Sequence, residues 1–283
     1  MEVDEAYRYC QKLARSHYEN FPVASLLLPR KVRPHIAAVY AFARTADDFA
    51  DEAEFEGSRL EKLGHFESQL TQLEKGKAEG PIFTALKETI RKYNIPLKLF
   101  FDLLTAFKSD VTVSRYRNFD DLLHYCRHSA DPVGRIVLHI MGYPKPQFLE
   151  YSDRICTALQ LANFWQDVSR DGDKKRVYIP EEDLVRFNYS YEELGRREYN
   201  DNFKKLIAFE TDRTREFFRS GKPLLAEIPG RFGLELKVTW LGGMEILNRI
   251  EKLEGNVLCQ RPALSKKDFL PLIFRALNKR SFR

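Results

Sequence analysis

Apolar residues recur along most of this chain at the three- and four-residue steps of an α-helix. Such runs occupy residues 97–107, 122–130 and 133–140. Proline and glycine separate the runs, for example at Gly80-Pro81. Alternating patterns typical of β-strands are nearly missing, and neither an internal repeat nor a long linker is found. The pattern predicts one all-α domain over residues 1–283.

Composition narrows the classes of function. The 283 residues have a net charge of +5, and Lys and Arg are spread along the chain, so no nucleic-acid partner is expected. A hydrophobic fraction of 43% allows a sizeable core, while no run of about 18 apolar residues predicts a membrane span. Four separated cysteines and an acidic N-terminus without an apolar signal segment predict a cytoplasmic protein. The oligomeric state cannot be read from these features.

The first candidate for chemistry is an acidic cluster in the segment Ala37–Glu52, which is rich in alanine and predicts a helix. Asp47, Asp48 and Asp51 share one helix face, where like charges repel unless a cation binds between them. Mg²⁺ prefers such carboxylate oxygens, and Arg44 lies one turn earlier. Aromatic residues beside the acids indicate that the helix faces a partly apolar cavity: Tyr40, Phe42 and Phe49. The alternative is a solvated helix end.

The second candidate lies in residues 160–180. Asn163, Asp167 and Asp171 are spaced i, i+4 and i+8, and Gln160 extends this polar row by one turn. Apolar residues fill the other faces, so the row belongs to a helix that is largely buried. Polar side chains of another helix could satisfy the row, or metal ions and a diphosphate could.

Cations follow the second cluster directly, at Lys174, Lys175 and Arg176. A short basic run alone is usually a solvated loop. Together with two acidic helix motifs, the run suits a site where two or three Mg²⁺ ions bridge a diphosphate.

Three segments together resemble the squalene and phytoene synthase family: ARTADDFADE, YCRHSADPVG and QLANFWQDVSRDGDKKRVYIP. The resemblance covers roughly Arg15 to Phe274. It implies an isoprenoid synthase helical bundle with a central active-site cavity, whose aspartate motifs face each other across the mouth. It also implies an enzyme that ionises a prenyl diphosphate.

The resemblance assigns roles position by position. Metal ligands would be Asp47, Asp51, Asn163, Asp167 and Asp171. The catalytic set would be Asp47, Asp48, Asp51, Asp167, Asp171 and Tyr178. Substrate contacts would come from Asn20, Phe21, Tyr40, Arg44, Tyr125, Gly134, Gln160, Gln166 and Arg176.

The chain departs from the usual family pattern at three places: Asn20-Phe21, Asp131-Pro132 and Gln166-Asp167. The segments NFPVASLLLP, SADPVGRIVL and NFWQDV are most similar to the hydroxysqualene-forming members of the hopanoid pathway. That similarity implies presqualene diphosphate as substrate, water capture and no use of NADPH. Members that make presqualene diphosphate from farnesyl diphosphate share both metal motifs, so they stay an alternative, as do squalene, dehydrosqualene and phytoene synthases.

Gln166 stands where many members have arginine. The neutral amide removes a fixed charge and five hydrogen-bond donors, which suits a site that holds one diphosphate. Its amide could hold a water molecule, or it could brace Asp167. Two other classes are open on residue patterns alone: an all-α nucleotide pyrophosphatase and a non-catalytic helical interaction protein.

The C-terminal segment predicts an amphipathic helix. Its apolar positions are Leu270, Ile273, Phe274 and Leu277. Its cations are Lys266, Lys267, Arg275, Lys279 and Arg280. Such a helix could lie on the inner face of the cytoplasmic membrane, or dock with its apolar stripe on the protein core.

Overall fold

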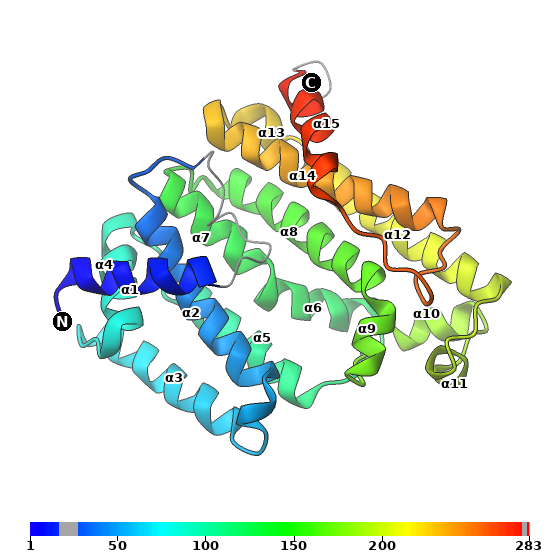
Figure 1. Ribbon diagram of the computed structural model, residues 1–283, viewed down its shortest axis with the longest axis horizontal. Helices are drawn as coiled ribbons and strands as arrows, with labels where there is room; N and C mark the ends of the chain where they lie inside the picture. The colour runs from blue at the N-terminus through cyan, green and yellow to red at the C-terminus, as the bar shows by residue number, and fades with distance from the viewer. Residues whose placement is uncertain (17–27, 279–281, 283) are drawn as a thin grey trace. The chain divides into compact units, whose positions relative to one another are not determined.

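The computed structural model describes residues 1–16, 28–278 and 282. Within these residues every regular element is helical, and an isolated bridge joins Arg115 to Val177 (Figure 1). The all-α prediction is confirmed. In chain order the helices are α1 (Val3–Ser16), α2 (Arg33–Asp51), the 3-10 helix η2 (Ala53–Phe55), α3 (Arg59–Glu74), α4 (Gly80–Tyr93), α5 (Lys98–Thr112), α6 (Phe119–Ser129), α7 (Asp131–Met141), α8 (Pro146–Gln166), α9 (Val168–Asp173), α10 (Glu181–Arg186), α11 (Tyr191–Gly195), α12 (Asp201–Gly221), α13 (Leu224–Glu227), α14 (Gly230–Lys252) and α15 (Lys266–Leu277).

The helices form two compact units, each assembled from two segments of the chain. Unit 1 contains residues 1–112 and 132–149, and unit 2 contains residues 113–131 and 150–283. No glycine- or proline-rich linker marks these boundaries in the sequence. One domain over residues 1–283 stays a prediction.

Helix α2 organises unit 1, because it packs against α1, α3, α4 and α5. The Phe42 ring, which is fully buried, lies 5.1, 6.0 and 5.4 Å from the rings of Phe66, Phe83 and Phe100. These aromatic contacts hold the middle of α2. The helix ends at Asp51, where Glu52 adopts an extended backbone with ψ of 141°. The first acidic cluster therefore occupies the last turns of a well-anchored helix.

A buried histidine joins α1, α2 and α4 within unit 1. His35 Nδ1 lies 2.9 Å from the Tyr7 hydroxyl and 3.1 Å from Thr89 Oγ1, and His35 Nε2 lies 3.0 Å from Lys92 Nζ. Burial, reinforced by the charge of Lys92, lowers the pKa of His35 to about 4. The imidazole is therefore neutral at neutral pH, and Nε2 accepts the hydrogen bond from Lys92.

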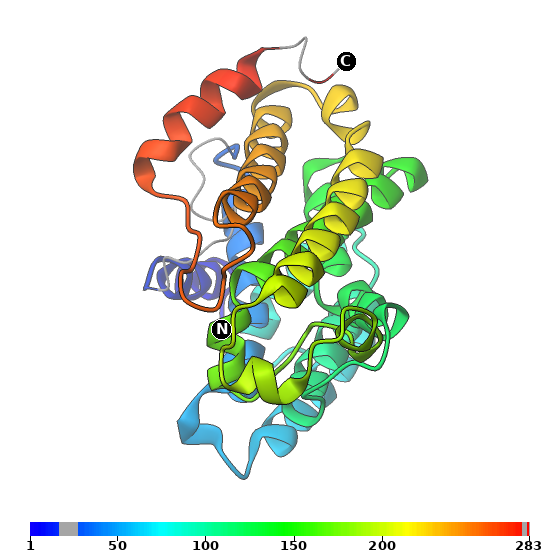
Figure 2. The ribbon, with the colours of Figure 1, turned by 90° about the vertical axis from the view of Figure 1, so that its right-hand side faces the viewer.

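In unit 2, helices α8, α12 and α14 approach one another closely, and α12 (yellow) and α14 (gold to orange) can be followed in Figure 2. Trp165 of α8 is fully buried, and its Nε1 donates a 2.8 Å hydrogen bond to Thr214 of α12. A Cβ atom at Gly243 of α14 would lie 2.9 Å from Leu159 Cδ2 and closer still to the Phe218 ring. Only glycine fits at that position without a shift of its neighbours.

Unit 2 also buries a charged triad between α10 and α12. Arg213 donates from Nη2 to Asp183 at 2.7 Å and to Glu210 at 2.6 Å. Its guanidinium lies 3.4 Å from the centre of the Phe119 ring. Glu210 is fully buried, and its Oε1 has no hydrogen-bond partner. The Arg213 guanidinium is therefore shared by two buried carboxyl groups.

Candidate active site

Helical spacing places three acids around one guanidinium at the end of α2. Arg44 Nη2 lies 2.7 Å from Asp48 Oδ1 and 3.6 Å from Glu52 Oε1, while Nη1 lies 3.4 Å from Asp47 Oδ2. Burial lowers the pKa of Arg44, but the charges of Asp48 and Asp47 outweigh it and raise that pKa above its ordinary value. Arg44 thus contacts the first acidic cluster, and its role as a substrate contact stays a prediction.

Two aromatic residues near this cluster pack on other rings of unit 1. Phe42 lies in the core of unit 1, and the Phe49 ring packs 5.0 Å from Phe55 and 5.5 Å from Phe66. Phe42 and Phe49 therefore pack on other rings of unit 1, and a partly apolar cavity in front of this helix stays a prediction. Tyr40 is buried one turn before Arg44, and its role as a substrate contact stays a prediction.

The second acidic row lies in unit 2 on two helices instead of one. Helix α8 ends at Gln166, and Asp167 is the N-cap of α9, with φ of −107° and ψ of 14°. Backbone hydrogen bonds of 2.9 Å still join Asp167 to Asn163 and Asp171 to Asp167. The predicted four-residue spacing is therefore kept across the break at Asp167.

Asp167 has a charged partner that the sequence did not reveal. Arg261 donates from Nε to Asp167 Oδ1 at 2.5 Å and from Nη2 to Oδ2 at 2.9 Å, which is a bidentate ion pair. Hydrogen bonding to Asp167 raises the pKa of Arg261. The two residues are far apart in sequence, and the loop that carries Arg261 has no periodic pattern, so no signal in the sequence indicated this contact.

Gln166 holds the same loop. Its side chain is 6% exposed, and its Nε2 donates a 2.5 Å hydrogen bond to the Pro262 carbonyl. Gln166 and Asp167 thus bind adjacent residues of one loop. Of the two roles left open by the sequence, this geometry favours bracing, because the amide nitrogen already has a protein partner.

Arg176 and Tyr178 lie on a strap after α9 that folds back on the second cluster. The Arg176 backbone N–H donates to the Asp171 carbonyl at 2.9 Å, and Val177 N–H donates to the Ser114 carbonyl at 2.8 Å. Tyr178 stacks on Phe164, with ring centroids 3.8 Å apart and planes within 10°. The strap is therefore fixed by both backbone and ring contacts.

Four aromatic rings gather beneath this strap. Tyr125 lies 6.0 Å from both Phe164 and Tyr178, and Tyr116 lies 5.8 Å from both Tyr125 and Tyr178. The structure thus brings the predicted residues Tyr125 and Tyr178 together. Tyr116 and Phe164 complete the cluster and were not predicted as site residues.

The other predicted residues are placed as follows. Gln160 lies in α8 of unit 2, and Gly134 lies in α7 within unit 1. Asn20 and Phe21 lie outside the described residues. Their roles stay predictions.

The donors of both clusters fit Mg²⁺ in part. Among residues 1–16, 28–278 and 282, no group of three His, Cys, Asp or Glu side chains converges as a complete metal site. The donors are nevertheless all oxygen atoms, and the Asp47 and Asp167 side chains are 45% and 22% exposed. Mg²⁺ commonly takes one or two carboxylates and completes its shell with water and phosphate oxygens. The oxygen donors of each cluster would suit such a partial set of Mg²⁺ ligands.

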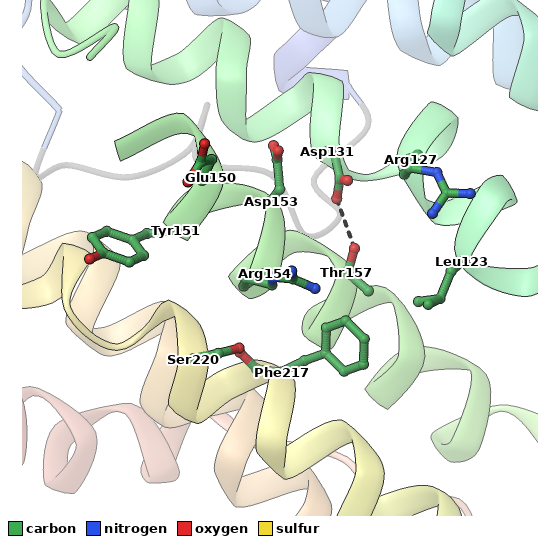
Figure 3. Close-up of a pocket in the computed structure, with 10 residues that line it drawn as sticks. All are labelled: Leu123, Arg127, Asp131, Glu150, Tyr151, Asp153, Arg154, Thr157, Phe217 and Ser220. Atoms are coloured by element: carbon green, nitrogen blue, oxygen red, sulfur yellow. Dashed lines mark hydrogen bonds between the residues drawn. The ribbon is translucent and has the colours of Figure 1, made fainter. Parts of the chain in front are cut away.

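Unit 2 also has a polar cavity of about 350 Å³ (Figure 3). None of the predicted site residues lines it. Its lining residues are Leu123, Arg127, Asp131, Glu150, Tyr151, Asp153, Arg154, Thr157, Phe217 and Ser220. Asp131, one of the departures from the family pattern, accepts a 2.8 Å hydrogen bond from Thr157 and is 7% exposed. The Asp131 carboxylate therefore makes a structural contact within unit 2.

Comparison with known proteins decides the family. The family model described as squalene/phytoene synthase matches residues 14–268. The chain belongs to this family. It is therefore an all-α isoprenoid synthase of a family that acts on prenyl diphosphates.

Several family members are similar along most of their length. A hydroxysqualene synthase of Rhodopseudomonas palustris is 35% identical over 268 residues, which cover 94% of this chain and 90% of that protein. A phytoene synthase of Arthrospira platensis is 28% identical, with 95% and 92% of the two chains covered. The crystal structure of the squalene synthase HpnC from Alicyclobacillus acidocaldarius is similar with a TM-score of 0.85 and 40% identity, covering 89% of this chain and 95% of that one. These matches confirm the predicted fold and family.

Proposed function

We propose that this enzyme converts presqualene diphosphate and water to hydroxysqualene and diphosphate, with Mg²⁺ and without a reductant. The observation that carries the proposal is the identity of 35% to a hydroxysqualene synthase over nearly the whole chain, against 28% to a phytoene synthase with similar coverage. A hydroxysqualene synthase of Zymomonas mobilis is also 32% identical over 93% of this chain.

Both acidic clusters would serve the departing diphosphate. Asp47 and Asp51 of α2, and Asn163, Asp167 and Asp171 of the second row, would supply the oxygen ligands. Mg²⁺, when bound, would act as a Lewis acid that neutralises charge on the leaving group. Arg44 and Arg176 would add fixed positive charge for the same oxygens.

The chemical step would break the carbon–oxygen bond to diphosphate, and the electron pair would leave with the diphosphate. The carbocation that remains would rearrange and take the oxygen atom of water, and the water proton would be lost to solvent. The rings of Tyr125, Phe164 and Tyr178 offer π-faces that stabilise positive charge without acting as carbon nucleophiles. This balance needs no hydride, which is why NADPH is not expected.

The test of the reaction is product analysis in ¹⁸O-labelled water. Purified enzyme would be given presqualene diphosphate and Mg²⁺ without reductant, and separately farnesyl diphosphate. Label in a triterpene alcohol, detected by mass spectrometry, supports the proposal. Consumption of farnesyl diphosphate with accumulation of presqualene diphosphate would instead identify a presqualene diphosphate synthase.

The test of the site is a set of aspartate variants. Asp47→Ala, Asp51→Ala, Asp167→Ala and Asp171→Ala should each lower turnover by about 100-fold or more, as removal of a transition-state contact does. Each variant should stay folded, although Asp167→Ala should lose some stability because it breaks the ion pair with Arg261.

Asp173→Ala is the matched control, because this exposed acid of α9 pairs with Arg197 and is not a predicted ligand. The control should keep near-normal turnover. Near-normal rates in two of the four cluster variants would contradict the metal assignment.

A further inference from the structure

Helix α15 has apolar side chains on two different sides. One side docks on α14 within unit 2: Leu272 and Ala276 are each 3% exposed, and Arg249 Nη2 binds Asp268 Oδ1 at 2.5 Å. Ser265 and Asp268 form a capping box at the start of the helix. These contacts fix which way α15 faces.

The other side of α15 is uncovered. Four large apolar residues are strongly exposed, at 46%, 63%, 68% and 59% of their surface: Phe269, Leu270, Phe274 and Leu277. Among the described residues, no other helix has so many exposed large apolar side chains. The predicted apolar stripe is therefore not the docking face, because Leu272 and Ala276 perform the docking.

The uncovered face is wide. At about 100° per residue, the positions of Phe269, Ile273, Leu277, Leu270 and Phe274 span about 140° of the helix circumference. A core-facing stripe of a surface helix has a similar width. Such a face normally marks an interaction site.

The charged residues in the sequence of this terminal segment are almost all positive. Lys266 to Arg283 contains six Lys or Arg and one acid, Asp268, which is bound to Arg249. Lys267 and Arg275 are exposed. Two copies meeting through this face would bring like charges together, whereas an anionic lipid surface complements them.

We propose that the uncovered face of α15 lies in the surface of an anionic membrane. The helix has 12 residues, and no helix in the described part of the chain is long and apolar enough to cross a bilayer, so the contact is parallel to the membrane plane. Phe269, Leu270, Phe274 and Leu277 enter the lipid boundary, and Lys267, which lies at the edge of this face, binds lipid headgroups. The membrane contact is independent of which prenyl diphosphate the enzyme uses.

The experiment is flotation of the full chain with vesicles of phosphatidylcholine alone or with added phosphatidylglycerol. The wild type should float with the anionic vesicles and much less with the neutral ones. Leu270→Glu/Phe274→Glu should lower partitioning by about tenfold or more, and Lys267→Gln by about fivefold, because one cation near such a surface contributes a several-fold effect. Point variants are preferred to truncation, since Leu272, Ala276 and Phe282 are buried.

Val185→Glu is the matched control, because Val185 is 74% exposed on α10 and outside this face. It should float like the wild type, and all variants should keep the wild-type melting temperature. Equal binding to both vesicle types would overturn the proposal. A wild type that does not float but sediments as a dimer, which Leu270→Glu/Phe274→Glu converts to a monomer, would assign the face to a second copy instead.

Discussion

Glu210 is expected to make the protein less stable as the pH rises above neutral. Burial, opposed by the charge of Arg213, raises the pKa of Glu210 from 4.5 to about 8. Between these values the folded state keeps a proton that the unfolded state releases. The free energy of unfolding therefore falls as pH increases, by about 1.4 kcal/mol per pH unit at most.

The window for the measurement lies between pH of about 6.5 and 8. His35 also titrates in the unfolded state near its ordinary pKa of about 6.5, but this contribution is the same in wild type and Glu210→Gln and cancels in their comparison. Over this window the Glu210 contribution amounts to about 2 kcal/mol. Glu210→Gln removes the titration while its amide oxygen can still accept from Arg213.

Urea unfolding followed by circular dichroism would measure the effect at several pH values. The stability of Glu210→Gln relative to wild type should rise with pH across the window. Glu251→Gln is the control, because Glu251 is 74% exposed and pairs with Arg215 on the surface. Parallel pH dependences for wild type and Glu210→Gln would refute the reasoning.

Three further outcomes are expected. Gly243→Ala should lower the free energy of unfolding by about 1–3 kcal/mol through overpacking. Gly242→Ala is the control, because its added Cβ would meet Leu264 at an ordinary 3.5 Å and should cost little. Equal melting temperatures for the two variants would contradict this prediction. Arg261→Gln should increase the affinity for Mg²⁺ in calorimetry without substrate, because the guanidinium no longer competes for Asp167; a lower affinity would show that Arg261 assists binding. The wild type should lose about 1 kcal/mol of stability per pH unit as the pH falls from 6.5 toward 4, because the lowered pKa of His35 means that only the unfolded state binds the extra proton. His35→Gln should remove this loss. An unchanged acid dependence in urea unfolding would refute the reasoning.

The helices could be predicted from periodicity because each buries one apolar face. The segment around Asp47 was found for this reason, and its spacing also located Arg44, since both lie on one helix turn. These features depend on residues that are close together in the sequence, so a periodic pattern is sufficient to predict them.

Other features depend on contacts between distant segments, which periodicity does not report. The ion pair of Arg261 with Asp167 joins a loop to a helix junction, and the rings of Tyr116 and Phe164 meet only after the strap folds back. The break at Asp167 has no proline or glycine beside it to reveal it. Phe42 lies in a filled core, and the sequence could not show this, because an apolar helix face has the same pattern whether it lines a cavity or a core.

The interleaved division of the chain has a consequence for its synthesis. Residues 132–149 belong to unit 1, yet they are made after residues 113–131, which belong to unit 2. A nascent chain ending at residue 112 lacks α7, in which Ile136, Leu138 and Ile140 are buried. Unit 1 can therefore be completed on the ribosome only once residue 149 has emerged. For the same reason, no single cut in the gene yields both units intact, and a split version of the enzyme would have to regain its activity by reassociation of fragments.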